Sequence, residues 1–115
     1  MKIPALQLAL DCSSTEEAIR DCQTGVVDEI DILECGYSLI AAEGARVVKL
    51  FREMYPEKPL LADLKIVDAG SKIGGMLLDG RPDYTTILCA CEPGTITSVQ
   101  EEARKRGLST QLQIE

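Results

Sequence analysis

The stretch Leu61-Ala62-Asp63-Leu64-Lys65-Ile66-Val67-Asp68-Ala69-Gly70 begins as an apolar strand and carries three ionisable side chains where that strand ends. Side chains alternate between the two faces of a strand, so Asp63 and Lys65 share a face, about 7 Å apart along the backbone. Asp68 follows in the turn. Because taking a lone charge out of water is costly, the cluster indicates ion pairing or a bound cation.

Short apolar runs recur along the chain, and each is followed by a turn and a segment with helical spacing. These runs predict strands at Leu6–Leu10, Ile30–Cys35, Leu60–Ile66, Tyr84–Cys89 and Leu112–Ile114. Helices are predicted from about Thr15, after a capping box of Ser14 and Glu17, then over Glu43–Met54 and Ser71–Asp79, and from Pro93 to a C-cap at Gly107. The order βαβαβαβαβ predicts an α/β fold of parallel strands covered on both faces.

Two parallel architectures fit this order. A doubly wound sheet of the flavodoxin-like type suits the length, but the place after the first strand holds Asp11-Cys12-Ser13-Ser14 and not a glycine-rich phosphate loop. A barrel of β/α units has its chemistry at the carboxyl ends of the strands. Ionisable residues stand at those ends in four strands, namely Asp11, Glu34, Asp63 with Lys65, and Glu115.

A purely structural origin of these charges is the alternative interpretation. A single acid such as Asp11 is often a helix cap or a solvated loop residue. Glu34, Asp63 and Lys65, however, lie within predicted strands, which favours a functional cluster. Hard oxygen ligands at neighbouring strand ends, with no His and no Cys-x-x-Cys pair nearby, suit Mg²⁺.

Composition excludes several classes of function. The 115 residues carry a net charge of −7 with three Tyr, one Phe and no Trp, which argues against a nucleic-acid partner. The absence of His removes His-based triads and His metal sites. Five Cys residues with mostly apolar neighbours indicate reduced thiols in a cytoplasmic protein. No apolar run approaches the ~20 residues of a membrane span, and no signal peptide is expected.

The sequence resembles a known family. Four blocks match in order: Leu6 to Asp11, Asp31-Ile-Leu-Glu34-Cys-Gly36, Leu61 to Gly70, and Gln113-Ile-Glu115. They resemble the first half of the 3-keto-L-gulonate 6-phosphate decarboxylases, in the orotidine monophosphate decarboxylase suprafamily, whose mark is Asp-x-Lys-x-x-Asp at the third barrel strand. The resemblance implies that residues 1–115 form a single partial domain, the N-terminal half of a (β/α)8 TIM barrel.

The resemblance also implies an activity and a set of roles. The substrate would be a phosphorylated keto sugar acid, 3-keto-L-gulonate 6-phosphate, which loses CO₂ through an enediolate to give L-xylulose 5-phosphate. Glu34 and Asp63 would hold Mg²⁺, and Lys65 would face the enediolate, with Asp63, Lys65 and Asp68 as the catalytic set. Asp11 would contact substrate hydroxyls, Glu115 would orient the cluster, and Asp68 would reach a neighbouring subunit's site in a homodimer.

Alternatives remain open beside this assignment. The related 3-hexulose 6-phosphate synthases, which condense formaldehyde with ribulose 5-phosphate, share most of the central block, and Glu115 after Gln-Ile favours the decarboxylase. The resemblance places the phosphate-gripping residues beyond Glu115. We therefore expect weak or no turnover from this chain alone, and a non-catalytic oligomerising half-barrel is the third possibility.

Overall fold

The strands of the structure occur at nearly the predicted positions. A computed structural model describes residues 3–108 and 111–115, with the backbone alone at 111–114. The strands are β1 Gln7–Leu10, β2 Ile32–Cys35, β3 Leu60–Ile66, β4 Tyr84–Ile87 and β5 Gln111–Ile114. The helices are α1 Thr15–Cys22, α2 Val26–Glu29, α3 Tyr37–Glu43, α4 Arg46–Met54, α5 Gly70–Leu78 and α6 Pro93–Lys105.

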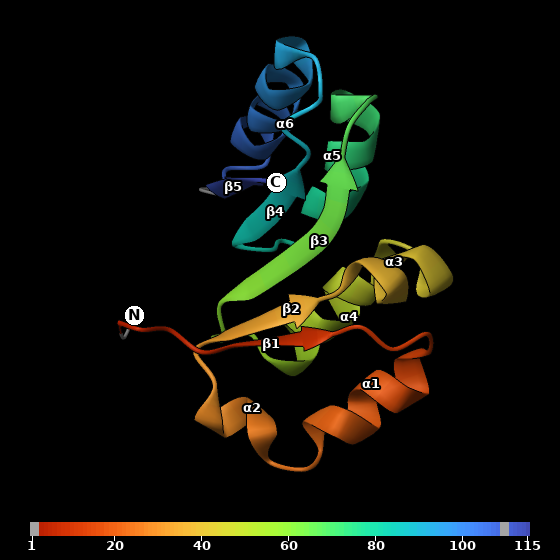
Figure 1. The fold of residues 1–115 in the computed structure, drawn as a ribbon, viewed down its shortest axis with the longest axis vertical. Coiled ribbons are helices and arrows are strands. Elements are labelled where there is room, and N and C mark those ends of the chain that lie inside the picture. The colour runs from red at the N-terminus through yellow and green to blue at the C-terminus, as the bar shows by residue number, and fades with distance from the viewer. Residues whose placement is uncertain (1–2, 109–110) are drawn as a thin grey trace.

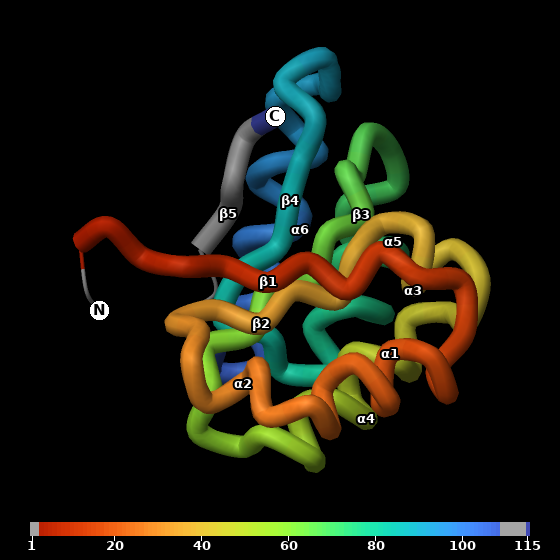
Figure 2. The backbone as a smooth tube through the Cα atoms, turned by 60° about the horizontal axis from the view of Figure 1, so that its bottom comes forward, coloured from red at the N-terminus to blue at the C-terminus, as the bar shows by residue number. Residues whose placement is uncertain are grey.

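The five strands form one parallel sheet in the sequential order β1-β2-β3-β4-β5. In Figure 1 the helices lie above, behind and below the strands, and in Figure 2 α1, α2 and α4 lie on the same side of β1 and β2. Right-handed crossovers between successive parallel neighbours place every helix on one face, as in a barrel. A doubly wound sheet reverses its strand order part-way, so the flavodoxin-like alternative is wrong and the half-barrel is confirmed.

The two faces of this sheet differ in character. One face packs against the helices, and its buried core side chains are Leu10, Leu33, Cys35, Leu60, Ala62, Ile66 and Ile87. The opposite face, called the inner face below, carries Gln7, Glu34, Asp63 and Thr86 by strand alternation and register. The sequence pattern predicted parallel strands that are covered on both faces. Helices cover the outer face alone, which leaves the inner face available for polar side chains.

Two helices were not predicted at their actual bounds. The helix expected over Glu43–Met54 begins later, as α4 at Arg46, because Gly44, with φ of +84°, ends the preceding helix α3. That helix, α3, occupies a stretch that was assigned to no element. The short helix α2 lay in a stretch that was assigned to no element. The first helix does begin at Thr15, and the Ser14 hydroxyl accepts a hydrogen bond from the Glu17 N–H at 3.2 Å.

Within the described residues, no helix combines the length and the apolar character that crossing a membrane requires.

A polar clamp joins α5 to α6 on the outer side. The side chain of Glu102 is only 11% exposed, and it accepts hydrogen bonds from Ser71 Oγ at 2.8 Å and Arg106 Nη1 at 2.6 Å. Lys105 Nζ lies 3.0 Å from the same carboxylate. Arg106, then Lys105 and Ser71, lower the pKa of Glu102 to about 2. The ionised carboxylate of Glu102 therefore links α5 to the C-terminal end of α6.

The Glu102 clamp predicts a specific acid sensitivity. A carboxyl group whose pKa is lower folded than unfolded contributes stability above its unfolded pKa, and this contribution is lost as the pH falls toward about 2. We expect Glu102→Gln to lower the urea midpoint most at neutral pH, and the parent and variant to converge between about pH 4.5 and pH 2. Glu101→Gln, at the exposed neighbouring position, is the control. A difference between parent and Glu102→Gln that does not change with pH would contradict this account.

Candidate active site

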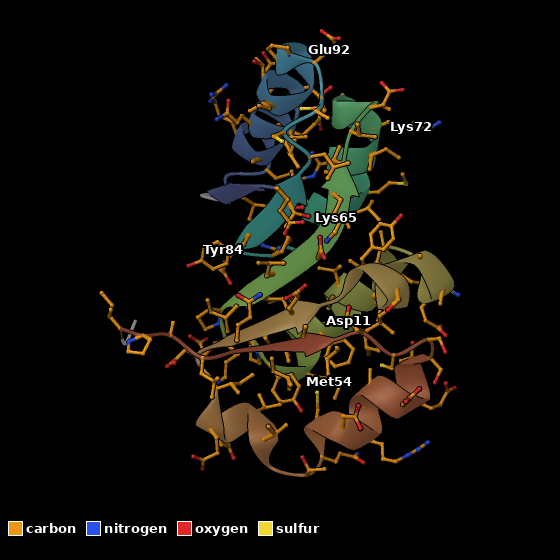
Figure 3. The ribbon with its side chains drawn as sticks, in the orientation of Figure 1. Asp11, Met54, Lys65, Lys72, Tyr84 and Glu92 are labelled. Atoms are coloured by element: carbon orange, nitrogen blue, oxygen red, sulfur yellow. The ribbon has the colours of Figure 1, made fainter. Side chains whose placement is uncertain are left out.

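The carboxyl ends of the strands bring charged side chains together on the inner face. Glu34 comes from β2, Asp63 and Lys65 from β3, and Glu115 directly follows β5. Figure 3 shows Lys65 on β3 near the middle of the sheet, among side chains that carry oxygen. Residues far apart in sequence therefore meet at one edge of the sheet, as expected for a parallel fold.

Lys65 is the centre of this cluster. Its Nζ donates to Asp63 Oδ2 at 2.5 Å and lies 3.0 Å from Glu115 Oε2. The hydrogen bond to Asp63 raises the pKa of Lys65, with a further contribution from Glu115 and against the opposing effect of burial. The ammonium therefore stays charged at neutral pH. Because 37% of the side chain is exposed, it is also accessible to a ligand on the inner face.

Glu34 is the acid of the cluster without an ion-pair partner among the described residues. Its Oε2 accepts a hydrogen bond from Gln7 Nε2 at 2.5 Å. Burial raises the pKa of Glu34, and the neighbouring carboxylates of Asp63 and Asp11 raise it further, while Gln7 and Lys65 oppose the shift. Glu34 thus lies in a negative field that one additional cation would relieve.

A distortion of β3 makes the Asp63–Lys65 contact possible. The register of β3 against β4 shifts between Ala62 and Ile66, and Lys65 has a left-handed backbone with φ of +53°. A non-glycine residue in this region costs about 1–3 kcal/mol, so surrounding contacts must maintain it. Thr86 on β4, 1% exposed, accepts a hydrogen bond from the Lys65 N–H at 2.9 Å and donates one to Asp63 Oδ1 at 2.6 Å.

Two residues at the rim complete the surroundings of the cluster. The Tyr37 ring, 48% exposed at the start of α3, lies 5.6 Å from Lys65 Nζ, a cation–π distance. Asp11 lies at the end of β1, exposed, and its carbonyl accepts a hydrogen bond from Ser38 Oγ at 2.7 Å. Gly36 permits this close approach, because a Cβ there would meet Asp11 Oδ1 at 2.0 Å.

Asp68 does not join the cluster. Its carboxylate accepts a hydrogen bond from the Ala69 N–H at 2.7 Å, and the residue is exposed. It lines a hollow of about 500 Å³ near the starts of α5 and α6, together with Lys72 and Glu92. Figure 3 shows Lys72 and Glu92 well away from Lys65. A role of Asp68 in the site of this same subunit has no support from its position.

The donor set fits a magnesium ion only in part. Among residues 3–108 and 111–115 there is no group of three or more Cys, Asp or Glu side chains arranged to hold a metal. Glu34 and Asp63 nevertheless offer two carboxylates from adjacent strands, on one face. Mg²⁺ is commonly bound by one or two carboxylates, with water and substrate oxygens as its other ligands. The neighbouring carboxylates of Asp63 and Asp11, which add to the effect of burial in raising the pKa of Glu34, agree with a site that favours a cation.

Three residues of the site escaped the sequence analysis, namely Gln7, Tyr37 and Thr86. Gln7 and Thr86 were detectable in principle, because each is a polar residue within an otherwise apolar strand and falls on the inner face. Tyr37 left no such signal, because it lies in a segment that was assigned to no element.

The five cysteines are free thiols, as the sequence predicted. Burial of Cys35 raises the pKa of its thiol to about 12.

Comparison with known proteins identifies the family. The chain is 32% identical over 114 residues to the 3-keto-L-gulonate-6-phosphate decarboxylase UlaD of Escherichia coli, covering 99% of this chain and 52% of that protein. The crystal structure of KGPDC from Streptococcus mutans superposes with a TM-score of 0.89 at 26% identity, covering 98% of this chain and 52% of the other. A 3-hexulose-6-phosphate synthase from Salmonella typhimurium gives a TM-score of 0.81 at 36% identity, covering 94% and 51%.

The chain spans about half the length of the curated relatives that it matches. The family profile described as orotidine 5'-phosphate decarboxylase / HUMPS matches residues 4–114, nearly the whole chain. The sequential half-barrel and the Asp63–Lys65 cluster at its strand ends agree with this match. The chain belongs to the orotidine 5'-phosphate decarboxylase / HUMPS family.

Proposed function

We propose that the protein is a Mg²⁺-dependent decarboxylase of 3-keto-L-gulonate 6-phosphate, with L-xylulose 5-phosphate and CO₂ as products. The observation that carries the proposal is the Lys65 ammonium, fixed by Asp63 and Glu115 and near Glu34, which has no ion-pair partner in the described part of the chain. The similarity to UlaD over the whole chain supports the same substrate class.

The chemical difficulty of this reaction is a developing negative charge. The bond between the carboxylate carbon and its neighbour breaks, and its electron pair stays on the sugar as an enediolate, which a proton then quenches. Lys65 is placed to stabilise that charge, because its ammonium is held in position before the reaction begins. One such preorganised donor contributes roughly 3 kcal/mol to the transition state.

Two carboxylates would hold the metal ion in this proposal. Glu34 and Asp63 are the ligands, and the bound Mg²⁺ would supply Lewis-acid stabilisation of the substrate oxygens. Asp63 also holds Lys65, since its Oδ2 pairs with the ammonium while its Oδ1 accepts the hydrogen bond of Thr86. Glu115 orients the ammonium through its ion pair at 3.0 Å, and Asp11 at the rim would contact substrate hydroxyls.

A second candidate is the aldol reaction of 3-hexulose 6-phosphate synthases. The identity to the Salmonella typhimurium synthase, 36%, exceeds the 26% identity to KGPDC from Streptococcus mutans. The same ammonium could stabilise an enediolate of ribulose 5-phosphate while formaldehyde is added. Consumption of formaldehyde in the presence of ribulose 5-phosphate, faster than CO₂ release from the keto sugar acid, would favour this candidate.

The first prediction of the proposed function concerns Lys65. Purified protein is expected to release CO₂ from 3-keto-L-gulonate 6-phosphate only weakly with Mg²⁺, as expected for half of a barrel, and to lose this activity with a chelator. Lys65→Ala should lower kcat at least about 100-fold, because the developing charge loses its fixed ammonium. Lys49→Ala, an exposed lysine on α4, is the control and should keep the parental rate. Turnover by Lys65→Ala at the parental rate would refute the role of Lys65.

The second prediction concerns the metal. Glu34→Gln keeps the size of the side chain and one acceptor oxygen for Gln7 but removes the charge that a divalent cation requires. We expect Mg²⁺ affinity, measured by calorimetry without substrate, to fall at least about tenfold. Glu53→Gln, on the exposed side of α4, controls for the change in net charge. Equal Mg²⁺ affinity in the Glu34 variant and the parent would remove Glu34 from the ligand set.

The third prediction concerns Asp68 and a homodimer. Because its carboxylate is exposed and lies apart from Lys65, we propose that Asp68 completes the site of a partner copy. Lys65→Ala and Asp68→Ala proteins, each impaired alone, should then recover part of the activity when they are mixed, since a mixed dimer contains one intact site. Light scattering on the same samples gives the oligomeric state. Failure to recover activity in a mixture that contains mixed dimers would rule out a shared site.

A further inference from the structure

A single buried hydroxyl holds both partners of the Lys65–Asp63 pair. Thr86 Oγ1 accepts the hydrogen bond of the Lys65 main-chain N–H at 2.9 Å. The same oxygen donates its proton to Asp63 Oδ1 at 2.6 Å. The residue is 1% exposed, so water does not compete for these contacts. The Thr86 hydroxyl thereby connects the backbone from which the lysine extends to the carboxylate that its ammonium reaches.

The hydrogen bond from the Lys65 N–H to Thr86 lies where the backbone of β3 is distorted. Lys65 has a φ of +53°, and the pairing of β3 with β4 changes register between Ala62 and Ile66. In a regular strand the N–H of Lys65 would seek a main-chain carbonyl, whereas here a side-chain oxygen accepts it. Without that oxygen, the left-handed conformation would leave a part-buried N–H without this partner, and the bulge would be free to relax.

The neighbouring threonine provides an internal comparison. Thr85 is also fully buried on β4, and its hydroxyl also bonds to β3, donating to the Ala62 carbonyl at 3.0 Å. By strand alternation it points to the opposite face, toward the helices. Thr85 and Thr86 therefore make similar contributions to strand pairing, and only Thr86 contacts the charged cluster.

We propose that Thr86 is a positioning residue for the reaction, acting through Lys65 and Asp63 and not through contact with the substrate. This inference rests on the proposed function. The hydroxyl maintains the left-handed backbone at Lys65 and fixes the second oxygen of Asp63, so that the ammonium is presented to the inner face in one orientation. A small misplacement of such a group is enough to cost a large factor in rate.

The test compares three variants of the full chain. Thr86→Val keeps the shape of the side chain and removes the hydroxyl, Thr86→Ser keeps the hydroxyl, and Thr85→Val is the matched control on the other face. The first measurement is the ¹³Cα chemical shift of Lys65 by NMR, which reports its backbone conformation. The second is the separate effect on kcat and KM for CO₂ release.

We expect Thr86→Val to move the Lys65 ¹³Cα signal toward extended values and to lower kcat about tenfold or more, with KM within about threefold of the parent. Thr86→Ser should retain the signal and most of kcat, and Thr85→Val should keep both even though it loses stability to urea. A merely structural role predicts equal effects of the two valine variants, and that result would overturn the proposal. So would an unchanged Lys65 signal in Thr86→Val.

Two further outcomes also have a definite meaning. If Thr86→Val does not fold, Thr86→Ala, which removes the hydroxyl without introducing the second methyl group of valine, takes its place with the same expected result. If the parent protein releases no CO₂, the proposed function fails for this chain by itself, in line with the weak or absent turnover expected above. The NMR comparison of Thr86→Val, Thr86→Ser and Thr85→Val still decides whether the hydroxyl holds the backbone of Lys65.

Discussion

The left-handed turn of the backbone at Lys65, where β3 changes register against β4, lets the ammonium of Lys65 meet the carboxylate of Asp63 at 2.5 Å. Two residues spaced by two along a regular strand have their side chains about 7 Å apart at the backbone, pointing the same way without touching. The bulge and the contacts from Thr86 close this distance. The local strain at Lys65 thus falls where a preorganised cation has a use in the proposed reaction.

The charge balance of the cluster explains what such a site favours. One ammonium, from Lys65, serves two carboxylates, Asp63 and Glu115, while Glu34 lies beside them in an unfavourable negative field. Burial of Asp63 limits solvent screening of its carboxylate, which strengthens both its attraction to Lys65 and its repulsion of Glu34. A divalent cation at Glu34 and Asp63 would relieve the repulsion, and an anionic intermediate would gain from Lys65. The arrangement fits a reaction in which negative charge develops on substrate oxygens.

Much of the fold was predictable from local pattern. The apolar runs located all five strands, and Ser14 marked the start of the first helix, because burial and capping leave a direct trace in the order of residues. The break at Gly44 and the helix α3 were missed, because α3 is short and Gly36 before it supplies no side-chain cap. Whether helices cover one face or two depends on the order of strands in the sheet, and that order leaves no local trace.

The sequence by itself determined which chemical groups the site contains, since Asp63, Lys65 and Glu34 stand in strands where an apolar residue would otherwise be expected. It also determined that Asp63 and Lys65 share a face, because the side-chain period of a strand is two. The family resemblance implied that Glu115 orients the cluster and that Asp68 serves a neighbouring subunit, but only the tertiary structure revealed the ion pair of Glu115 with Lys65, the position of Asp68 outside the cluster, and the two hydrogen bonds of Thr86. These outcomes depend on register between strands and on one left-handed residue, and both are set by packing across the sheet rather than by neighbours along the chain.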